Sequence, residues 1–147
     1  MRPAVEAVIR RLSRTDLPWV NARYADIAFA PSRDADLLVS ADMDGKSIGL
    51  GRLVPLEDGS AEMGGIHVLP EFRGRAIASR IVEHLVELSP YPRLFCIPFT
   101  PLEKFYRRFG FDTPRPGLSL PKEVRDKLAW CEGRYPDPVC LLVRDSP

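Results

Sequence analysis

Hydrophobic residues recur along the chain with two spacings, and these spacings predict a mixture of strands and helices. Short apolar and β-branched runs predict strands at residues 37–43, 47–54, 61–69, 94–97 and 139–143. Apolar residues on one helical face predict four helices. The first starts after Asp16, and the others cover residues 76–88, 100–109 and 121–131. Asp44-Gly45 is a typical two-residue hairpin turn, so residues 37–69 are expected to form an antiparallel meander.

The segment from residue 5 to residue 12 fits two structures. Its apolar spacing is compatible with a helix, whereas its β-branched content and the following Ser13-Arg14-Thr15 suit a short strand. We favour the strand because a helix begins directly afterwards, where Thr15 or Asp16 can cap and Pro18 occupies the first turn.

Two of the predicted helices have clear local signals. The helix at residues 76–88 presents one apolar stripe, formed by Ile77, Ile81, Leu85 and Leu88. The helix at residues 100–109 begins with a Thr-x-x-Glu capping box and a proline at its first position, and Gly110 ends it. The element order is therefore β, α, meander, α, β, α, α, β, which predicts one α+β (mixed α/β) domain over residues 1–147.

Composition narrows the possible functions. Hydrophobic residues make up 45% of the 147-residue chain and the net charge is +1, which suits a folded core and argues against a nucleic-acid partner. Three cysteines without CxxC or zinc-ligand spacing predict neither a disulfide framework nor a metal site, and favour the cytoplasm. No apolar stretch approaches ~18 residues, so we expect neither secretion nor a membrane span.

Residues 64–78 contain the clearest functional signal. A strand ends at Pro70, a short basic loop follows, and a helix starts at small residues. The unpaired amides of a helix N-terminus attract anions, and Arg73 and Arg75 add positive charge. The run therefore suits a phosphate-binding loop, although a tight strand-to-helix turn with exposed arginines would have the same composition. It is not GxGxxG and follows a meander, so a Rossmann-type nucleotide enzyme is a weaker alternative.

This run resembles motif A of the GNAT acetyltransferases, V-x-P-x-x-R-G-x-G-I-G/A, which binds the pyrophosphate of acetyl-CoA. The matching residues are Val68, Pro70, Arg73, Gly74, Ile77 and Ala78. Residues 105–111, FYRRFGF, resemble motif B, and the resemblance covers roughly residues 5–112. It implies a GNAT-like fold with a central, mostly antiparallel β-sheet flanked by helices.

Two positions depart from the family pattern. Ala76 replaces a glycine, and we expect helical backbone geometry there to tolerate the alanine with weaker binding at most. Phe99 occupies the place of an asparagine that contacts the cofactor in many members, so this contact is not carried over.

The resemblance implies that an amine attacks the thioester of acetyl-CoA directly. The cofactor would lie along the strand and the loop, contacting Ile66, His67, Val68, Arg73, Gly74, Arg75, Ala76, Ile77 and Ala78. The Val68 amide could stabilise the oxyanion. Gly64 and Gly65 suit the close approach of a ligand, or alternatively make room for a bulky side chain.

Tyr106 in motif B is the candidate general acid, because a phenol with a pKa of about 10 can protonate the departing thiolate. The alternative is a core aromatic residue beside Phe105 and Phe109. Glu62 is the candidate general base, since it aligns with a glutamate of many members, and it could instead be a solvated strand-end carboxylate. His67 is a second candidate, on the opposite strand face by alternation. Glu57 and Glu71 are more peripheral candidates for this role.

Further expectations concern the surroundings of the site and its partners. Cys96 is expected to be buried and inert, and Trp130 to be a core aromatic or a wall of the acceptor pocket. The resemblance implies that the acceptor is a primary amine of a small molecule, an amino acid or a peptide, and a homodimer is compatible with such folds. The alternative function is a non-catalytic acyl-CoA-binding module with the same fold.

Overall fold

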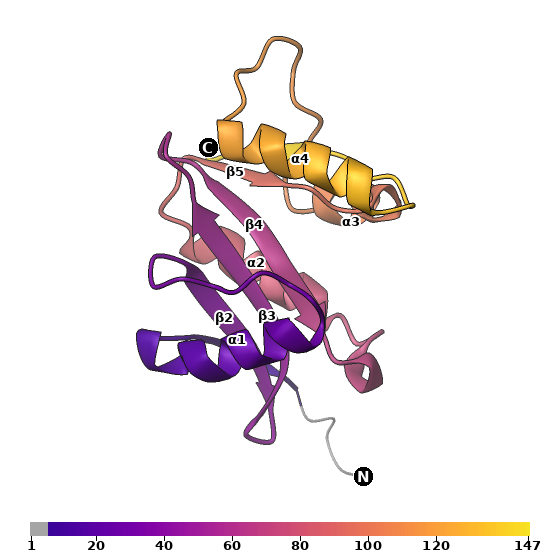
Figure 1. Ribbon diagram of the computed structural model, residues 1–147. Coiled ribbons are helices and arrows are strands. Elements are labelled where there is room, and N and C mark those ends of the chain that lie inside the picture. The colour runs from indigo at the N-terminus through magenta and orange to yellow at the C-terminus, as the bar shows by residue number, and fades with distance from the viewer. Residues whose placement is uncertain (1–5) are drawn as a thin grey trace. The chain divides into compact units, whose positions relative to one another are not determined.

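The computed structural model describes residues 6–147 and has a mixed α/β fold, in which helices flank a six-stranded sheet (Figure 1). Its strands are β1 (Val8–Arg11), β2 (Leu37–Met43), β3 (Lys46–Pro55), β4 (Ala61–Val68), β5 (Arg93–Cys96) and β6 (Leu142–Asp145). Its α-helices are α1 (Leu17–Asp26), α2 (Ile77–Leu88), α3 (Glu103–Arg107) and α4 (Lys122–Arg134). The predicted fold class is therefore confirmed.

The strands are arranged in the sheet in their sequence order, β1 to β6. The pairs β1–β2, β2–β3 and β5–β6 are antiparallel. The pair β4–β5 is parallel and joins Ala61 to Leu94 and Glu62 to Phe95. The expected, mostly antiparallel sheet is thus present, with one parallel pair that the helix α2 connects.

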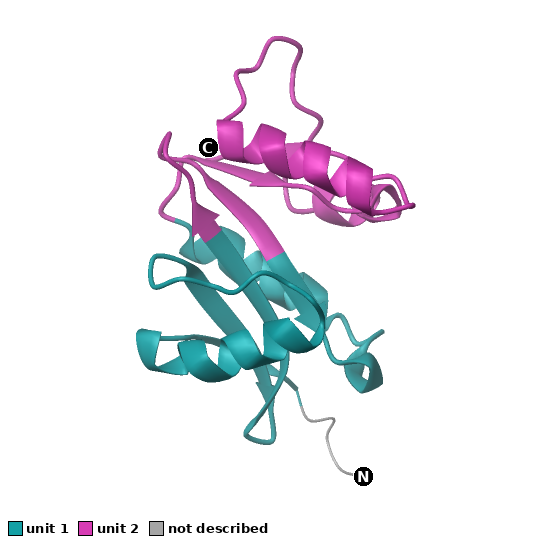
Figure 2. Ribbon diagram, viewed as in Figure 1, with its two compact units in different colours: residues 1–53, 65–89 teal, residues 54–64, 90–147 magenta. Residues whose placement is uncertain are grey.

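The chain forms two compact units, which Figure 2 distinguishes by colour. Unit 1 consists of residues 1–53 and 65–89, and unit 2 consists of residues 54–64 and 90–147. The strands β3 and β4 each contribute residues to both units.

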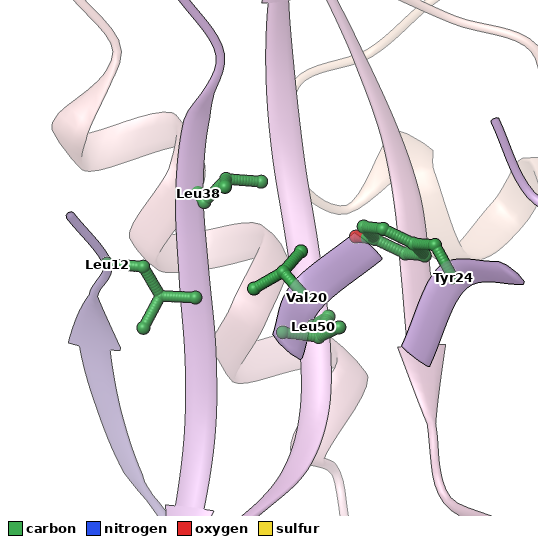
Figure 3. Packing of buried hydrophobic residues seen from close by; sticks show 5 residues of the cluster. All are labelled: Leu12, Val20, Tyr24, Leu38 and Leu50. Atoms are coloured by element: carbon green, nitrogen blue, oxygen red, sulfur yellow. The ribbon is translucent and has the colours of Figure 1, made fainter. Parts of the chain in front are cut away.

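Side-chain alternation along β3 gives unit 1 its two helix-covered faces. Leu50 points to the α1 side, where it joins Leu12, Val20, Tyr24 and Leu38 in a buried cluster (Figure 3). Gly51 points to the α2 side, where an added Cβ would lie 2.5 Å from Ile81 and 3.0 Å from Leu85. The glycine therefore lets α2 pack closely on the strand.

The core of unit 2 is built around β5 and the chain that follows it. Phe95, Cys96, Phe111 and Leu142 are buried, and α4 contributes the buried residues Val124 and Cys131. Tyr106 from α3 lies against Phe111, with 5.9 Å between the ring centroids.

The predicted hairpin turn and the predicted first strand are both present in the structure. Asp44 and Gly45 both have positive φ, 52° and 75°, as a tight hairpin turn requires. The segment preceding α1 is a strand at Val8–Arg11, which decides the helix-or-strand question for the part of it that is described. Val5 lies outside the described residues.

Several element boundaries differ from the predictions, among them those of the last strand and of the last two helices. The last strand covers residues 142–145 instead of 139–143, and Val139 forms only an isolated bridge with Phe99. The expected helix at 100–109 is a 3-10 turn, Thr100–Leu102, followed by the five-residue α3. The helix α4 continues to Arg134, three residues further than expected.

Some predicted side-chain roles also differ. Thr100 does not form the expected capping box, because its hydroxyl donates a hydrogen bond to the Pro138 carbonyl oxygen at 3.3 Å. Leu88 is 37% exposed, and Val82 is buried in α2 in its place. Trp130 is 55% exposed, so its interpretation as a core aromatic is wrong. The contact of Thr100 and the exposure of Leu88 and Trp130 depend on residues distant in the sequence, which local spacing does not reveal.

Candidate active site

The loop between β4 and α2 is exposed and open to a ligand. After a 3-10 turn at Pro70–Phe72, the four residues 73–76 are all exposed, and α2 begins at the buried Ile77. Gly74 has a φ of +80°, and a Cβ added there would meet nothing within 4 Å. The backbone at Gly74 is therefore accessible to an anion.

Ala76 adopts the left-handed conformation, with φ 59° and ψ 20°, at the N-cap of α2. The expectation of helical geometry at this position is wrong. A left-handed residue with a Cβ costs about 1–2 kcal/mol, which explains why the family pattern has a glycine here. This left-handed residue leads directly into α2, whose first amides have no helical partner.

The N-terminus of α2 carries no competing negative charge. No side chain caps it, and its first turn contains no acidic residue. Ala78 follows Ile77 in this first turn, and Ala76 accepts a hydrogen bond from the Arg80 amide at 3.3 Å. Amides at the start of a helix and the helix dipole together favour a bound anion such as a phosphate.

The two arginines of the loop are oriented by separate contacts. The Arg73 Nε donates a hydrogen bond to the Val68 carbonyl oxygen at 3.1 Å. The Arg75 guanidinium lies 5.4 Å from the centroid of the Phe72 ring. Both side chains belong to exposed residues, so they can place positive charge around the loop.

The C-terminal part of β4 contains three predicted cofactor-binding residues. Ile66 and His67 are partly buried, and Val68 is 8% exposed. Burial lowers the pKa of His67 below its usual value, and the nearby charges of Arg73 and Arg23 lower it further. His67 is therefore neutral at pH 7 and able to accept a proton.

Gly65 interrupts the regular geometry of β4, with a φ of +62° inside the strand. A Cβ there would lie 2.6 Å from the Tyr24 hydroxyl and 2.9 Å from the Arg52 Nε. Of the two interpretations of Gly65, the contacts favour room for bulky side chains over the close approach of a ligand. The alternation used to put His67 on the opposite face from Glu62 does not extend regularly across Gly65.

Glu62 lies in unit 2 and is buried, with 8% exposure, so it is not a solvated strand-end carboxylate. The Lys127 ammonium on α4 donates hydrogen bonds to both of its oxygens, Oε1 and Oε2, the second at 2.9 Å. An acceptor amine that uses Glu62 as its base must share or displace this lysine. Sequence reasoning missed Lys127, because nothing in the pattern of α4 distinguishes it from an exposed helix residue.

Tyr106 is largely buried in unit 2, with 8% exposure. It packs edge-on against Phe105 and Phe111, at centroid distances of 5.0 and 5.9 Å. Burial raises the pKa of its phenol above the usual value, and the neighbouring Cys96 contributes to the increase. The hydroxyl is therefore protonated at all physiological pH values, as a general acid requires.

Cys96 is 2% exposed, and burial raises the pKa of its thiol far above the usual value. It is a neutral thiol at neutral pH, as expected from the sequence, and is not an activated nucleophile. In residues 6–147, no group of three or more His, Cys, Asp or Glu side chains is placed to hold a metal ion. No helix in that range is long and apolar enough to cross a membrane.

A second cluster that sequence reasoning missed surrounds Arg52 in unit 1. Arg52 is 8% exposed, and its guanidinium lies 4.4 Å from the centroid of the Tyr24 ring. One signal could have identified it, namely a charged residue inside the otherwise apolar run of residues 48–54.

Comparison with known proteins agrees with this geometry. Residues 7–111 match the profile of the Acetyltransferase (GNAT) family. No curated protein sequence matches the chain.

Solved structures with the same fold have low sequence identity. Rv2747 from Mycobacterium tuberculosis, in complex with CoA, is 19% identical, with a TM-score of 0.70 over 95% of this chain and 99% of that one. A GNAT family acetyltransferase from Elizabethkingia anophelis with acetyl-CoA bound is 15% identical, with a TM-score of 0.63 over 96% and 99%.

N-acetylglutamate synthase from Neisseria gonorrhoeae, complexed with coenzyme A and N-acetyl-glutamate, is 18% identical, with a TM-score of 0.68 over 97% of this chain. The present chain spans only 36% of the length of that synthase. These similarities concern the fold.

Proposed function

Because the chain belongs to the acetyltransferase (GNAT) family, we propose that it transfers an acetyl group from acetyl-CoA to a primary amine of a small molecule, an amino acid or a peptide. The observation that supports this most directly is the loop of residues 73–76, where left-handed Gly74 and Ala76 precede an uncapped, uncharged helix N-terminus. CoA or acetyl-CoA in the structural neighbours agrees with this donor.

In this proposal, the loop holds the pyrophosphate of the cofactor. The backbone amides of residues 74–78 would donate hydrogen bonds to its phosphate oxygens, and Arg73 and Arg75 would add positive charge. The backbone of Ile66, His67 and Val68 pairs with the pantetheine arm. Acetyl-CoA supplies a thioester whose carbonyl carbon accepts the amine.

Tyr106 supplies the proton that the departing thiolate needs. Its hydroxyl makes no hydrogen bond with any other residue that the structure describes, so it is available to a ligand. Its raised pKa keeps the phenol protonated, although it also lowers its acidity.

Removal of the amine proton is the second requirement, because a lysine-like amine with a pKa of about 10.4 is almost fully protonated at pH 7. Glu62 can accept this proton once Lys127 no longer occupies both carboxylate oxygens. His67, neutral at pH 7, is the alternative acceptor on the same strand.

The pairing of Glu62 with Lys127 also favours the second candidate function, an acyl-CoA-binding module without turnover. In such a module the candidate base stays engaged with the lysine and CoA is never released as a free thiol. Measurement of free-thiol release with a panel of amines distinguishes the two candidates.

Calorimetric titration with acetyl-CoA tests the loop. Reversing one charge with Arg73→Glu should weaken binding by about tenfold or more, because a carboxylate replaces a cation next to a phosphate. Arg11→Glu, an exposed charge reversal on β1, is the matched control and should bind like the wild type. Equal affinity of all three proteins would contradict the loop assignment.

Tyr106→Phe tests the general acid. Turnover should fall by roughly 100-fold, the lower end of the range for a lost proton donor, while the Kd for acetyl-CoA stays unchanged. Tyr91→Phe makes the same change in the loop before β5 and should leave turnover intact. Full activity of the Tyr106→Phe variant would exclude the role in proton transfer.

A further inference from the structure

Arg52 on β3 is a buried cation without an anionic partner. The residue is 8% exposed, yet no carboxylate of the described residues lies within 4.0 Å of its guanidinium nitrogens. Arginines are rarely buried unless they are paired, since an uncompensated charge is costly to remove from water. A buried charge of this kind destabilises the folded chain unless another group compensates it.

The neutral contacts of Arg52 orient its guanidinium without cancelling its charge. The Nη1 donates hydrogen bonds to the Ala30 carbonyl oxygen at 2.9 Å and to the Ser32 hydroxyl at 2.7 Å. The Tyr24 ring covers one face of the group. Nε and Nη2 hydrogen-bond to no described residue, and neither is among the fully buried atoms that lack a partner.

The residues around Arg52 are themselves held in place. Tyr24 is fully buried and donates a hydrogen bond from its hydroxyl to the Gly65 carbonyl oxygen at 2.8 Å. Asn21 binds the backbone of Ser32 twice, at 3.1 and 2.7 Å, and so ties the segment after α1 to the helix. The guanidinium is therefore preorganised by α1, this segment and β4.

Asp36, whose charge acts on Tyr24 as that of Arg52 does, forms no ion pair with Arg52. Asp36 accepts a hydrogen bond from the Arg33 amide at 3.1 Å through Oδ2, and its Oδ1 has no partner. The positive charge of Arg52 is thus left for a group that the chain does not provide.

We propose that Arg52 binds a carboxylate of the acceptor, so that the acceptor is an amine that also carries a carboxylate, in the first instance an α-amino acid. The amine of this acceptor rests on the proposed acetyl transfer. Its carboxylate is inferred from Arg52 alone. A guanidinium binds a carboxylate through two parallel hydrogen bonds. The Nε and Nη2 of Arg52, which hydrogen-bond to no described residue, are the two donors that such a pair needs. Arg52 lies next to Gly65 on β4, the strand proposed to carry the pantetheine arm, so the acceptor would lie beside the donor.

Kinetics with matched acceptors test the proposal. The twenty standard amino acids are assayed for free-thiol release with acetyl-CoA, and each accepted one is compared with its carboxamide, which keeps the amine and loses the negative charge. In the wild type, kcat/KM should favour the acid by about 10- to 100-fold, as expected for hydrogen bonds between charged groups. Arg52→Met should lower kcat/KM for the acid by a similar factor and leave that for the amide within about twofold.

Two control variants separate recognition from folding. Arg52→Lys retains the charge without the two-pronged geometry and should recover part of the preference for the acid. Arg10→Met removes an exposed arginine from β1, where Asp42 is its partner at 2.8 Å, and should leave the preference unchanged. The Kd for acetyl-CoA and the thermal unfolding midpoint of each variant show whether the fold has been kept.

A second measurement does not depend on turnover. The Arg52 Nε–H resonance, assigned by its loss in Arg52→Lys, is followed by NMR during titration with N-acetylglycine and with its uncharged amide. A saturable shift with the acid alone supports the carboxylate site even if acetyl-CoA fails to bind, which would count against the proposed function only. No shift with the acid, or equal losses for acid and amide in Arg52→Met, would overturn the assignment to Arg52.

Discussion

Ala76 shows how a single residue sets the entry into the cofactor loop. Its left-handed backbone is a conformation that glycine adopts without strain, and it lies at the start of a helix whose amides we propose to bind phosphate. Gly74, two residues earlier, also has a positive φ, which restricts substitution there, and the open space around it leaves room for a ligand.

Ala76→Gly should therefore stabilise the protein. Release of the left-handed strain exceeds the added freedom of the unfolded chain, and the free energy of unfolding should rise by about 0.5–1 kcal/mol. Ala78→Gly, two residues later inside α2, is the matched control and should lower it by up to about 1 kcal/mol. Urea unfolding of both variants measures the change in the free energy of unfolding. A change of the same sign in both variants would contradict the strain at Ala76.

Arg52 and Gly65 make a second point at this scale. The absence of a side chain at Gly65 admits both the Tyr24 hydroxyl and the Arg52 Nε, so a small residue determines where a buried charge lies. The glycine thus serves the proposed carboxylate site indirectly.

At the scale of elements, the ion pair of Lys127 with Glu62 connects α4 to β4 across 65 residues of sequence. The Glu62 side chain is 10% exposed and that of Lys127 is 45% exposed, so the pair is partly shielded from water. Such a pair both holds the helix to the strand and limits access to the candidate base.

Lys127→Met should lower the free energy of unfolding by roughly 1–2 kcal/mol, because it leaves a shielded carboxylate without its partner. The loss is smaller than for a fully buried pair because the lysine is half-exposed. Lys122→Met removes a lysine from the same helix whose pair with Asp126 is exposed, and it should have no measurable effect.

The double variant Glu62→Gln, Lys127→Met completes a thermodynamic cycle with the two single variants. It should lose less stability than the single variants predict together, since no uncompensated charge remains. Strict additivity of the two changes in urea unfolding would show that the pair contributes nothing as a pair.

At the scale of the whole molecule, buried groups couple stability to pH. Burial raises the pKa values of Tyr24 in unit 1 and of Cys96, Tyr106 and Cys131 in unit 2 above those of the unfolded chain. Below the unfolded values, 9.0 for cysteine and 10.0 for tyrosine, both states keep these protons and the stability is fully present.

Stability should therefore fall as the pH rises above about 9, since the unfolded chain then binds fewer protons than the native one. Each titrating group contributes up to about 1.4 kcal/mol per pH unit. Urea unfolding at pH 7, 9 and 10.5 measures this decline, and Cys96→Ala should reduce its slope just above pH 9. A free energy of unfolding that stays constant to pH 10.5 would contradict the burial of these groups as neutral species.

The sequence by itself determined those features that neighbouring residues produce together. The hairpin turn at Asp44-Gly45, the amphipathic pattern of α2 and the loop with Gly74 are local, and each was predicted close to its observed position. Their geometry depends on backbone freedom, apolar spacing and helix ends, which a few consecutive residues specify.

Only the tertiary structure decided which distant side chains meet. The partners of Glu62, Arg52 and Thr100 and the shift of β6 all follow from contacts between segments far apart in the chain. Whether a charged side chain is exposed or buried depends on what packs over it, and this packing is a property of the folded chain that local spacing does not contain.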